Sequence, residues 1–563
     1  MVQVTRRGLL GGAALGSIGL AACKTAPVAD EGFQGELAFL HGVASGDPLP
    51  GAMILWTRVT PLSGTGPVTV TWEVFEAGSQ TPAASGEVVT SEARDYTVKA
   101  DATGLKAATA YTYRFKAKAA DGDVISPEGR TRTPSADASA PVKLAVASCA
   151  NWQFGLFNVY REMANEPGLD AIVHLGDYMY EYGTDGYGGD VAAQLGRPHD
   201  PPTEIISLSD YRRRHAQYKS DPNLQAAHAA APWICTWDDH ESANDSYRTG
   251  AENHNPDKGE GEWSDRKMRA LQAYFEWMPI REPKSGEVTS AVWRTFRFGN
   301  VATVHALDSR LTGRSEPLDW GSALAGAATQ EEIGARVMAT MQAVADPART
   351  MLGAEQEAWL AGELKASVQS GATWQVLANQ VVMARNRLPD FTTIMTEEQK
   401  AAQDRPEVLA MLPFTALGLP WNLDAWDGYP MARERLYASV AEAGAALVTL
   451  AGDTHTAFAN ELYDAVGVRR GVEFACTSVS SPGMGAYVKA VPDLGQLIAD
   501  VNPEVVWHDP FSHGFTLVTL TPESARADYR TVSTIYASEY TAATVASYAA
   551  SVDKGSVTAL SPV

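Results

Sequence analysis

The sequence predicts an α/β protein whose amino-terminal part is an all-β domain. Three observations support this fold class. The chain has 563 residues, enough for two or more domains. Its first part alternates apolar and polar residues in a strand-like pattern, and beyond residue 141 short apolar runs alternate with helical stretches. A composition of 45% hydrophobic and 20% charged residues suits a large buried core and excludes a disordered or collagen-like chain.

The chain begins with an expected export signal at residues 1–23. The paired Arg6 and Arg7 precede an uncharged, weakly apolar run that ends in small residues before Cys23. The stretch TRRGLL resembles a twin-arginine signal, and LAAC resembles the lipobox of bacterial lipoproteins. We therefore expect the twin-arginine export machinery as a partner and a periplasmic or extracellular location. Membrane attachment is expected only through a lipid anchor on Cys23, because no later apolar run reaches the roughly 20 residues that span a bilayer.

Residues 36–133 predict a β-sandwich. The runs AMILWTRVTP, VTVTWEVFEA and AYTYRFKAKA alternate apolar and polar residues between turn residues. Leu105, Tyr111 and Tyr113 resemble the late strands of immunoglobulin and fibronectin type III domains. The small, polar, Pro-flanked segment 133–141 is the expected linker to the next domain.

Residues 141–537 predict a catalytic domain of α/β type. Apolar strands are expected at KLAVASC, AIVHLGD, WICTWDD, VATVHALDS, TWQVLANQ and ALVTLAGD. Helices are expected at residues 155–165, 264–277, 354–368 and 431–443. Antiparallel strands follow near the end, and residues 538–563, rich in Ala, Ser and Tyr, are expected to be a tail. The run from Arg212 to His215 is expected to be a solvated helix face.

Charge and cysteine content narrow the function classes. A formal charge of −22 repels the phosphate backbone, so no nucleic-acid partner is expected. Four cysteines are too few for a disulfide scaffold in a chain of this length. Cys235 and Cys476 lie inside apolar strands and are expected to be inert thiols.

The expected chemistry lies where predicted strands end. In open α/β sheets the carboxyl ends of strands collect ligands, so residues there are expected to converge. The residues are Ser148-Cys149, Gly176-Asp177-Tyr178-Met179-Tyr180, Trp237-Asp238-Asp239-His240-Glu241, Asn379 and Gly452-Asp453-Thr454-His455. Crowded carboxylates are unfavourable unless a cation offsets their charge, which favours a metal site.

The donor types suggest two different metals. Cys149, Asp177, Tyr180 and His455 form an anionic, electron-donating set that suits a trivalent ion such as Fe³⁺. Asp239, Asn379 and Asp453, with Asp177 as a possible bridge, offer only oxygen and favour Ca²⁺, Mg²⁺ or Mn²⁺. We therefore predict a mixed pair of metals.

Together the Ser-Cys, Gly-Asp-x-x-Tyr, Trp-Asp-Asp-His-Glu and Gly-Asp-x-His motifs, in this order, resemble the alkaline phosphatase D (PhoD) family, which is related to the purple acid phosphatases. The segments His41–Pro48 and Leu307–Arg310 also look like family features. The resemblance implies a layered sandwich of two mixed sheets flanked by helices, preceded by the β-sandwich. It also implies Fe³⁺ with Ca²⁺, and hydrolysis of phosphomonoesters and phosphodiesters.

The resulting hypothesis is a secreted phosphoester hydrolase that uses a metal-activated hydroxide. His240, beside the ligand Asp239, is the candidate general acid, or it only binds phosphate. Asn244 and Arg310 are candidate substrate contacts; Arg310, with Asp308, is alternatively a supporting pair. The roles of Asp238 and Glu241, as ligands or as supporting acceptors, stay open.

Other functions compete with this hypothesis. A phospholipase D-like specificity is an alternative within the same family. A metal-free cysteine hydrolase would use Cys149 as nucleophile and His240 or His455 as base. A non-enzymatic surface-binding lipoprotein would explain Cys23 and the β-sandwich, but it leaves the acidic strand ends unexplained.

Overall fold

A computed structural model describes residues 32–283, 292–553 and 555–563. The expected export signal at residues 1–23, with Cys23, lies outside these ranges. Within them, no helix combines the length and the apolar character needed to cross a membrane.

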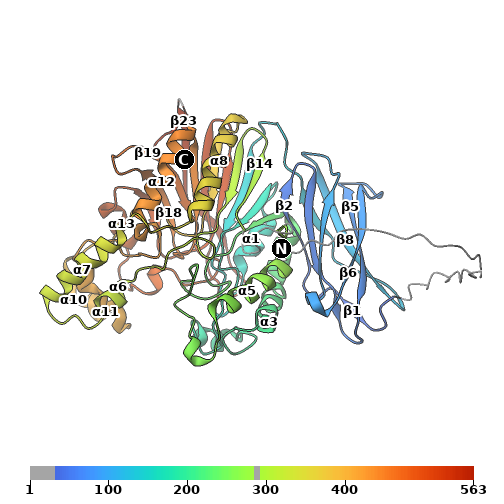
Figure 1. Cartoon of the computed structure of the whole chain (residues 1–563), viewed down its shortest axis with the longest axis horizontal. Coiled ribbons are helices and arrows are strands. Elements are labelled where there is room, and N and C mark those ends of the chain that lie inside the picture. Colours follow the sequence, from blue (N-terminus) through green and yellow to red (C-terminus); the bar gives the residue numbers. More distant parts are fainter. Residues whose placement is uncertain (1–31, 284–291, 554) are drawn as a thin grey trace, which may run out of the picture.

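Two large β-sheets occupy the middle of the molecule (Figure 1). The first follows the order β24 (Ser556–Val557), β23 (Ala542–Asp553), β22 (Ser524–Val532), β21 (His513–Leu520), β11 (Val142–Ala147), β12 (Ala171–His174), β13 (Pro232–Cys235), β2 (Val43–Leu49), β3 (Ala52–Arg58) and β7 (Thr97–Thr103), with β25 (Ser561–Pro562) beside β23. The second follows the order β14 (Arg294–Phe298), β15 (Ala302–Ala306), β16 (Trp374–Ala378), β17 (Ala446–Ala451), β19 (Arg469–Ala475), β18 (Ala457–Tyr463) and β20 (Val505–Asp509). Both sheets mix parallel and antiparallel pairs.

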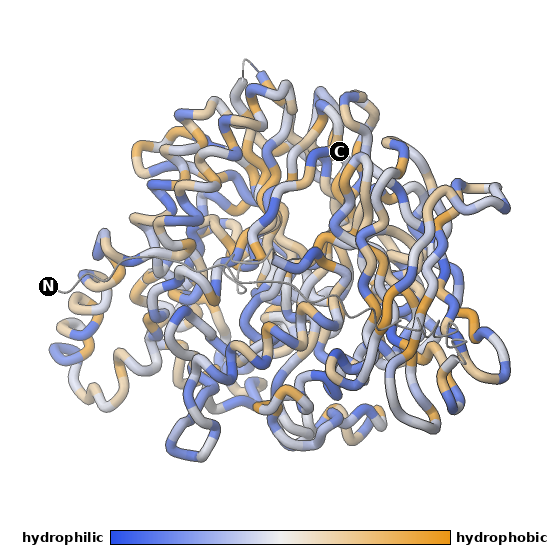
Figure 2. The backbone as a smooth tube through the Cα atoms, turned by 45° about the vertical axis from the view of Figure 1, so that its right-hand side comes forward, coloured by the Kyte–Doolittle hydropathy of each residue, from blue (hydrophilic) through white to orange (hydrophobic). Residues whose placement is uncertain are grey.

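The two sheets share one apolar core. Side chains of both inner faces, among them Val146, Val173, Val304 and Val376, pack in the same cluster. Figure 2 shows apolar stretches along the strands in the interior of the molecule. Because both faces of these strands are covered, the strands read as continuous apolar runs in the sequence.

Helices cover the outer faces of the two sheets. The first sheet packs against α1 (Asn158–Asn165), α3 (Leu208–Lys219), α4 (Pro222–Ala230) and α5 (Trp263–Trp277). The second packs against α8 (Ala354–Gln369), α12 (Pro430–Ala443) and α13 (Leu494–Val501). The layered α/β fold is therefore confirmed, and the four predicted helices correspond to α1, α5, α8 and α12.

Local sequence signals fix the ends of several helices. Ser207 and Asp210 form a capping box at the start of α3. Pro430 begins α12, and Gly444 ends it with φ of 64°. The other α-helices of the described residues are α2 (Gly189–Leu195), α6 (Trp320–Leu324), α7 (Gln330–Val344), α9 (Phe391–Ile394), α10 (Glu397–Ala401) and α11 (Pro406–Thr415). Of these, α6, α7, α10 and α11 lie at the lower left of Figure 1.

The amino-terminal β-sandwich shares a sheet with the rest of the molecule. Its outer sheet contains β10 (Gly129–Arg132), β8 (Ala110–Ala119), β5 (Val68–Glu76) and β6 (Ala84–Thr90), with β9 (Gly122–Ile125) beside β8. The facing strands β2, β3 and β7 continue the first large sheet through the parallel pair β13–β2. A Cβ on Gly46 would lie 2.1 Å from the Pro279 carbonyl oxygen, so this junction requires glycine.

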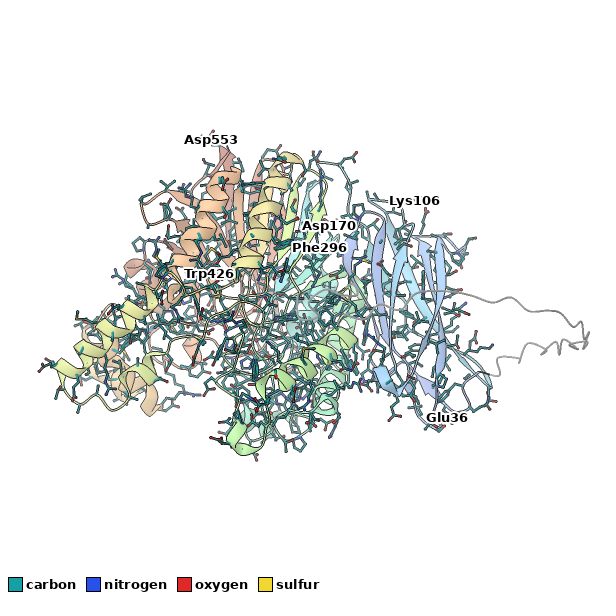
Figure 3. The ribbon with its side chains drawn as sticks, in the orientation of Figure 1. Glu36, Lys106, Asp170, Phe296, Trp426 and Asp553 are labelled. Carbon is teal, nitrogen blue, oxygen red and sulfur yellow. The ribbon has the colours of Figure 1, made fainter. Side chains whose placement is uncertain are left out.

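One detail of the sandwich matches its immunoglobulin-like sequence pattern. The hydroxyl of Tyr111 accepts a hydrogen bond from the backbone N–H of Lys106 at 2.8 Å. Lys106 is labelled in Figure 3, at the upper edge of the sandwich. This contact has the form of the tyrosine corner found in such domains. A short ribbon of β1 (Leu37–Ala38) and β4 (Thr60–Pro61) lies at the opposite, lower end of the sandwich in Figure 1.

The carboxy-terminal segment differs from the tail that the sequence suggested. Strand β23 pairs with β22 from Val532↔Ala542 to Ser524↔Ser551, and β24 and β25 fold back onto β23. Ala and Ser carry little strand propensity, and burial does not alternate along β23, so the sequence carries no clear strand signal there. Strands β23, β24 and β25 therefore lie at the edge of the first sheet.

Candidate active site

The predicted motifs converge where strands of both sheets end. Cys149 follows β11, Asp177 follows β12 and Asp239 follows β13 in the first sheet; Asp453 and His455 follow β17 in the second. A bridge between Ser148 and Ser478 joins the two sheets there. The Cys149 carbonyl accepts hydrogen bonds from the backbone of residues 480 and 481, at 3.3 and 3.2 Å.

The backbone at this convergence is strained. Cys149, Asp177, Asp453 and His455 have φ of 61°, 53°, 65° and 59°, in the left-handed region that non-glycine residues rarely adopt. Gly176 has φ of 110°, and a Cβ there would lie 2.3 Å from the Asp238 nitrogen. Strain of this kind collects at functional sites, where the surrounding structure holds it.

One group of donors contains sulfur and nitrogen. Ligand atoms of Cys149, Asp177 and His455 all lie within 4.8 Å of one another. The Tyr180 hydroxyl lies 3.2 Å from Asp177 Oδ2 and 3.3 Å from His455 Nε2, and it accepts a hydrogen bond from Ser481 at 2.7 Å. The four residues that the sequence assigned to an iron site therefore face one another.

The imidazole of His455 is prepared to act as a ligand. Its Nδ1 lies 3.1 Å from the Pro482 carbonyl oxygen, so Nδ1 carries the proton and Nε2 keeps its lone pair towards Tyr180. Burial lowers the pKa of His455 to about 4, which keeps the ring neutral at neutral pH. A neutral imidazole is the form that binds metals.

Two further groups contain carboxylates on the other side of Asp177. Asp238, Asp239 and Asp453 form one group within 4.8 Å, and Asp177, Asp239 and His240 form another. Asp177 thus belongs both to the sulfur-containing group and to a carboxylate group. Asp238 Oδ2 is buried without a hydrogen-bond partner, which leaves a lone pair uncompensated.

The local electrostatics favour a bound cation. Burial, with the charges of Asp239 and Asp238, raises the pKa of Asp177 well above its usual value, although His240 opposes the shift. Burial and Asp238 raise the pKa of Asp453, against the effect of Arg310. Burial and Asp177 also raise the pKa of the Cys149 thiol. A cation would favour the charged forms, so these residues fit a metal centre, whereas Cys149 by itself remains a thiol and is a poor nucleophile.

Arg310 contacts several of the clustered carboxylates. It is fully buried, and its guanidinium pairs with Asp238, with Asp424 at 2.7 Å and with Asp453 at 3.2 Å. Asp424 was not found from the sequence, because it lies in a loop without a motif. With its donors directed at carboxylates, Arg310 holds the acidic residues in place.

His240 contacts a carboxylate that the sequence reading overlooked. Its Nδ1 lies 2.7 Å from Oε2 of Glu181, which is fully buried. Glu181 also accepts from the Asn244 backbone at 2.7 Å and from Asn253 Nδ2 at 2.9 Å. The His240 ring lies 4.1 Å from the Tyr180 ring, centroid to centroid. The only sequence signal for Glu181 was its position directly after the Gly-Asp-x-x-Tyr motif.

Three other candidates have supporting contacts. Asn379 follows β16. Its Nδ2 donates a hydrogen bond to the Val381 carbonyl, and its Oδ1 accepts one from Trp426 Nε1 at 3.1 Å. Trp426 is labelled in Figure 3. Glu241 accepts backbone N–H groups of residues 177, 178 and 238. Asp308 accepts from Trp237 and from the backbone of residues 310 to 312. Glu241 and Asp308 therefore stabilise the loops that carry the site.

Fold and site together define a class: a layered α/β hydrolase with thiol, imidazole, phenol and carboxylate groups gathered at strand ends. Residues 144–529 match the family described as PhoD-like phosphatase, and residues 24–135 match the PhoD-like phosphatase N-terminal domain. The chain is 33% identical over 514 residues to alkaline phosphatase D of Bacillus subtilis (strain 168), covering 87% of this chain and 77% of that protein. A solved structure of PhoD matches with a TM-score of 0.74 and 31% identity, covering 93% of this chain and 92% of the other. The chain therefore belongs to the PhoD-like phosphatase family, and it is a phosphoric ester hydrolase.

Proposed function

We propose that this protein is an exported phosphoesterase that hydrolyses phosphomonoesters and phosphodiesters at a mixed iron and calcium centre. The observation that carries the proposal is the shared position of Asp177 between two ligand groups of different chemistry. Cys149, Tyr180 and His455 on one side suit iron. On the other side Asp239, which shares a group with Asp177, is joined by Asp453 and by the predicted ligand Asn379. These three offer only oxygen and suit calcium, with magnesium or manganese as alternatives.

Each residue then has a separate task. Bound cations would lower the pKa of water and neutralise phosphoryl oxygens. Asp239 is held by the backbone N–H of Asp245 at 2.7 Å. Burial lowers the pKa of His240, but Asp239, Glu181 and Asp177 outweigh it and favour the imidazolium. In that form Nδ1–H donates to Glu181 and Nε2–H is available to protonate the leaving oxygen. The Asn244 side chain, 3.3 Å from Glu252, retains donor capacity for a phosphoryl oxygen. For Arg310 we propose a positioning role in place of the substrate contact expected from the sequence.

The iron assignment is tested by elemental analysis of purified protein, together with a visible spectrum. A phenolate bound to iron gives a charge-transfer band, so the protein should be coloured. Tyr180→Phe should abolish the band, whereas Tyr182→Phe, on the adjacent turn, should retain it. Colourless, iron-free and fully active protein would refute the iron assignment.

Metal dependence is tested separately by chelation. Activity on p-nitrophenyl phosphate and bis(p-nitrophenyl) phosphate should be lost on chelation and return when iron and calcium are restored. Full activity in the chelated protein, lost in Cys149→Ser, would instead support the metal-free cysteine hydrolase.

A further inference from the structure

An aromatic wall stands beside the metal-binding residues. It consists of Phe154, Tyr182, Tyr187 and Tyr487, all of which are partly exposed. The ring centroids of Phe154 and Tyr187 are 4.7 Å apart, and those of Tyr182 and Tyr187 are 5.8 Å apart. The hydroxyls of Tyr187 and Tyr487 lie 2.8 Å apart. Tyr187 lies in the loop after β12 of the first sheet, and Tyr487 lies in the loop after β19 of the second. This contact therefore connects the two sides of the site.

The aromatic wall is in contact with the reacting groups. The Tyr182 ring lies 5.5 Å from the ring of His240, the proposed proton donor. The Tyr187 ring lies 6.3 Å from that of Tyr180, a proposed ligand. A leaving group protonated by His240 would therefore lie next to the Tyr182 ring.

Two further side chains, Phe511 and Arg405, lie next to Tyr487. Phe511 is 48% exposed, and a Cβ on Gly485 would lie 2.1 Å from Phe511 Cδ1, so its ring lies directly on the loop before Tyr487. The guanidinium of Arg405 lies 4.7 Å from the Tyr487 ring centroid. Aromatic faces bind planar rings by stacking and tolerate many ring types.

The charge of the molecule restricts the substrate further. A net charge of −22 disfavours polyanionic substrates. A phosphodiester carries one negative charge at its phosphoryl group and two organic groups, one of which leaves. Aromatic side chains, with the guanidinium of Arg405 over the Tyr487 ring, suit an uncharged planar group better than a chain of phosphates.

Resting on the proposed function, we infer that Tyr182, Tyr187 and Tyr487 determine leaving-group specificity and favour phosphodiesters whose leaving group is a planar aromatic or heteroaromatic ring. The three tyrosines act by stacking against this ring. Their hydroxyls take no part in proton transfer.

The experiment compares two esters whose leaving groups have similar pKa: phenyl methyl phosphate and hexafluoroisopropyl methyl phosphate. The protein, loaded with iron and calcium, should prefer the phenyl ester in kcat/KM by about two- to tenfold, the range expected for one aromatic contact. Tyr187→Leu should lower kcat/KM on the phenyl ester by a larger factor than on the fluoroalkyl ester, so that the preference is lost. Tyr187→Phe keeps the ring and loses only the bridge to Tyr487, so it should keep the preference.

Controls separate a binding role from a structural one. Tyr536→Leu removes a tyrosine that is 58% exposed and outside the wall, and should change neither rate. Tyr182→Leu repeats the test on the His240 side if Tyr187→Leu lowers the melting temperature. Equal losses on both esters, or hydrolysis of both without preference, would overturn the inference and leave the proposed function intact. Hydrolysis of neither ester by the loaded protein would overturn both.

Discussion

Replacing Glu181 with Gln tests whether this residue sets the proton donor of the reaction. Gln has nearly the same shape and keeps hydrogen-bonding atoms near His240, Asn244 and Asn253, but it removes the buried charge. A hydrogen bond to a charged group contributes about 1.5–3 kcal/mol, against about 1 kcal/mol for a neutral one. The imidazolium of His240 should therefore lose about 1–2 kcal/mol of stabilisation, which lowers its pKa by about one unit.

The assay is the pH dependence of kcat on two esters, one with an alkyl and one with a p-nitrophenyl leaving group. Burial lowers the pKa of His240, but Asp239, Glu181 and Asp177 outweigh burial and raise it well above 6.5. A proton donor works below its pKa, so kcat on the alkyl ester falls as pH rises through that value. In Glu181→Gln this fall should begin about one unit lower, with about five- to thirtyfold less activity on its alkaline side.

The p-nitrophenyl ester is the internal control. Its leaving group needs little protonation, so its rate should change much less in Glu181→Gln. His240→Ala should show the same contrast more strongly. Equal losses on both esters in either variant, or an unmoved alkaline limb in Glu181→Gln, would refute the proton-donor role.

Three further predictions concern stability. Burial lowers the pKa of Lys219 from 10.5 to about 7, so the unfolded chain binds more protons between these pH values and stability rises with pH there. Lys219→Met should therefore raise the melting temperature most below about pH 7. An equal gain at about pH 10 would contradict this. Gly176→Ala should lower stability and iron content more than Gly168→Ala. Gly168 also has a positive φ, of 72°, but no atom lies near a Cβ built there. Equal effects of the two substitutions would show that only backbone strain matters. Arg310→Met should cost about 3–5 kcal/mol by leaving buried carboxylates unpaired. Calcium should restore part of the lost melting temperature, and a variant insensitive to calcium would argue against cation binding at these acids.

The convergence of the site was predictable because each motif directly follows a strong apolar strand. A strand that is buried on both faces is legible in a sequence, and the carboxyl ends of parallel neighbours meet. Hence Cys149, Asp177, Tyr180, Asp239 and His455 were placed together from the sequence. The roles of Glu181 and Asp424 were not predictable in this way, because each depends on a tertiary partner, His240 or Arg310.

Burial of charged residues was also not readable from local pattern. The run from Arg212 to His215 looks like a solvated face, yet Arg214 is fully buried and donates to the carbonyls of Tyr180 and Pro201. Those acceptors come from loops distant in sequence. The pairing of β2 with β13 was also not predictable from the local sequence of β2. It depends on Gly46, which allows the close approach of Pro279.

The backbone strain at the ligands links fold to chemistry. Cys149, Asp177, Asp453 and His455 are all in the left-handed region, at a cost of about 1–3 kcal/mol each. Each of these residues follows a buried strand of the shared core. The packing of that core stabilises the left-handed backbone conformation, which a free loop would not keep. The strained turns bring side chains from two sheets together, and repulsion between the clustered acids adds to the cost. A cation removes that repulsion, so cation binding and retention of the strained turns should be coupled: loss of metal should loosen the turns first and leave the sheets folded.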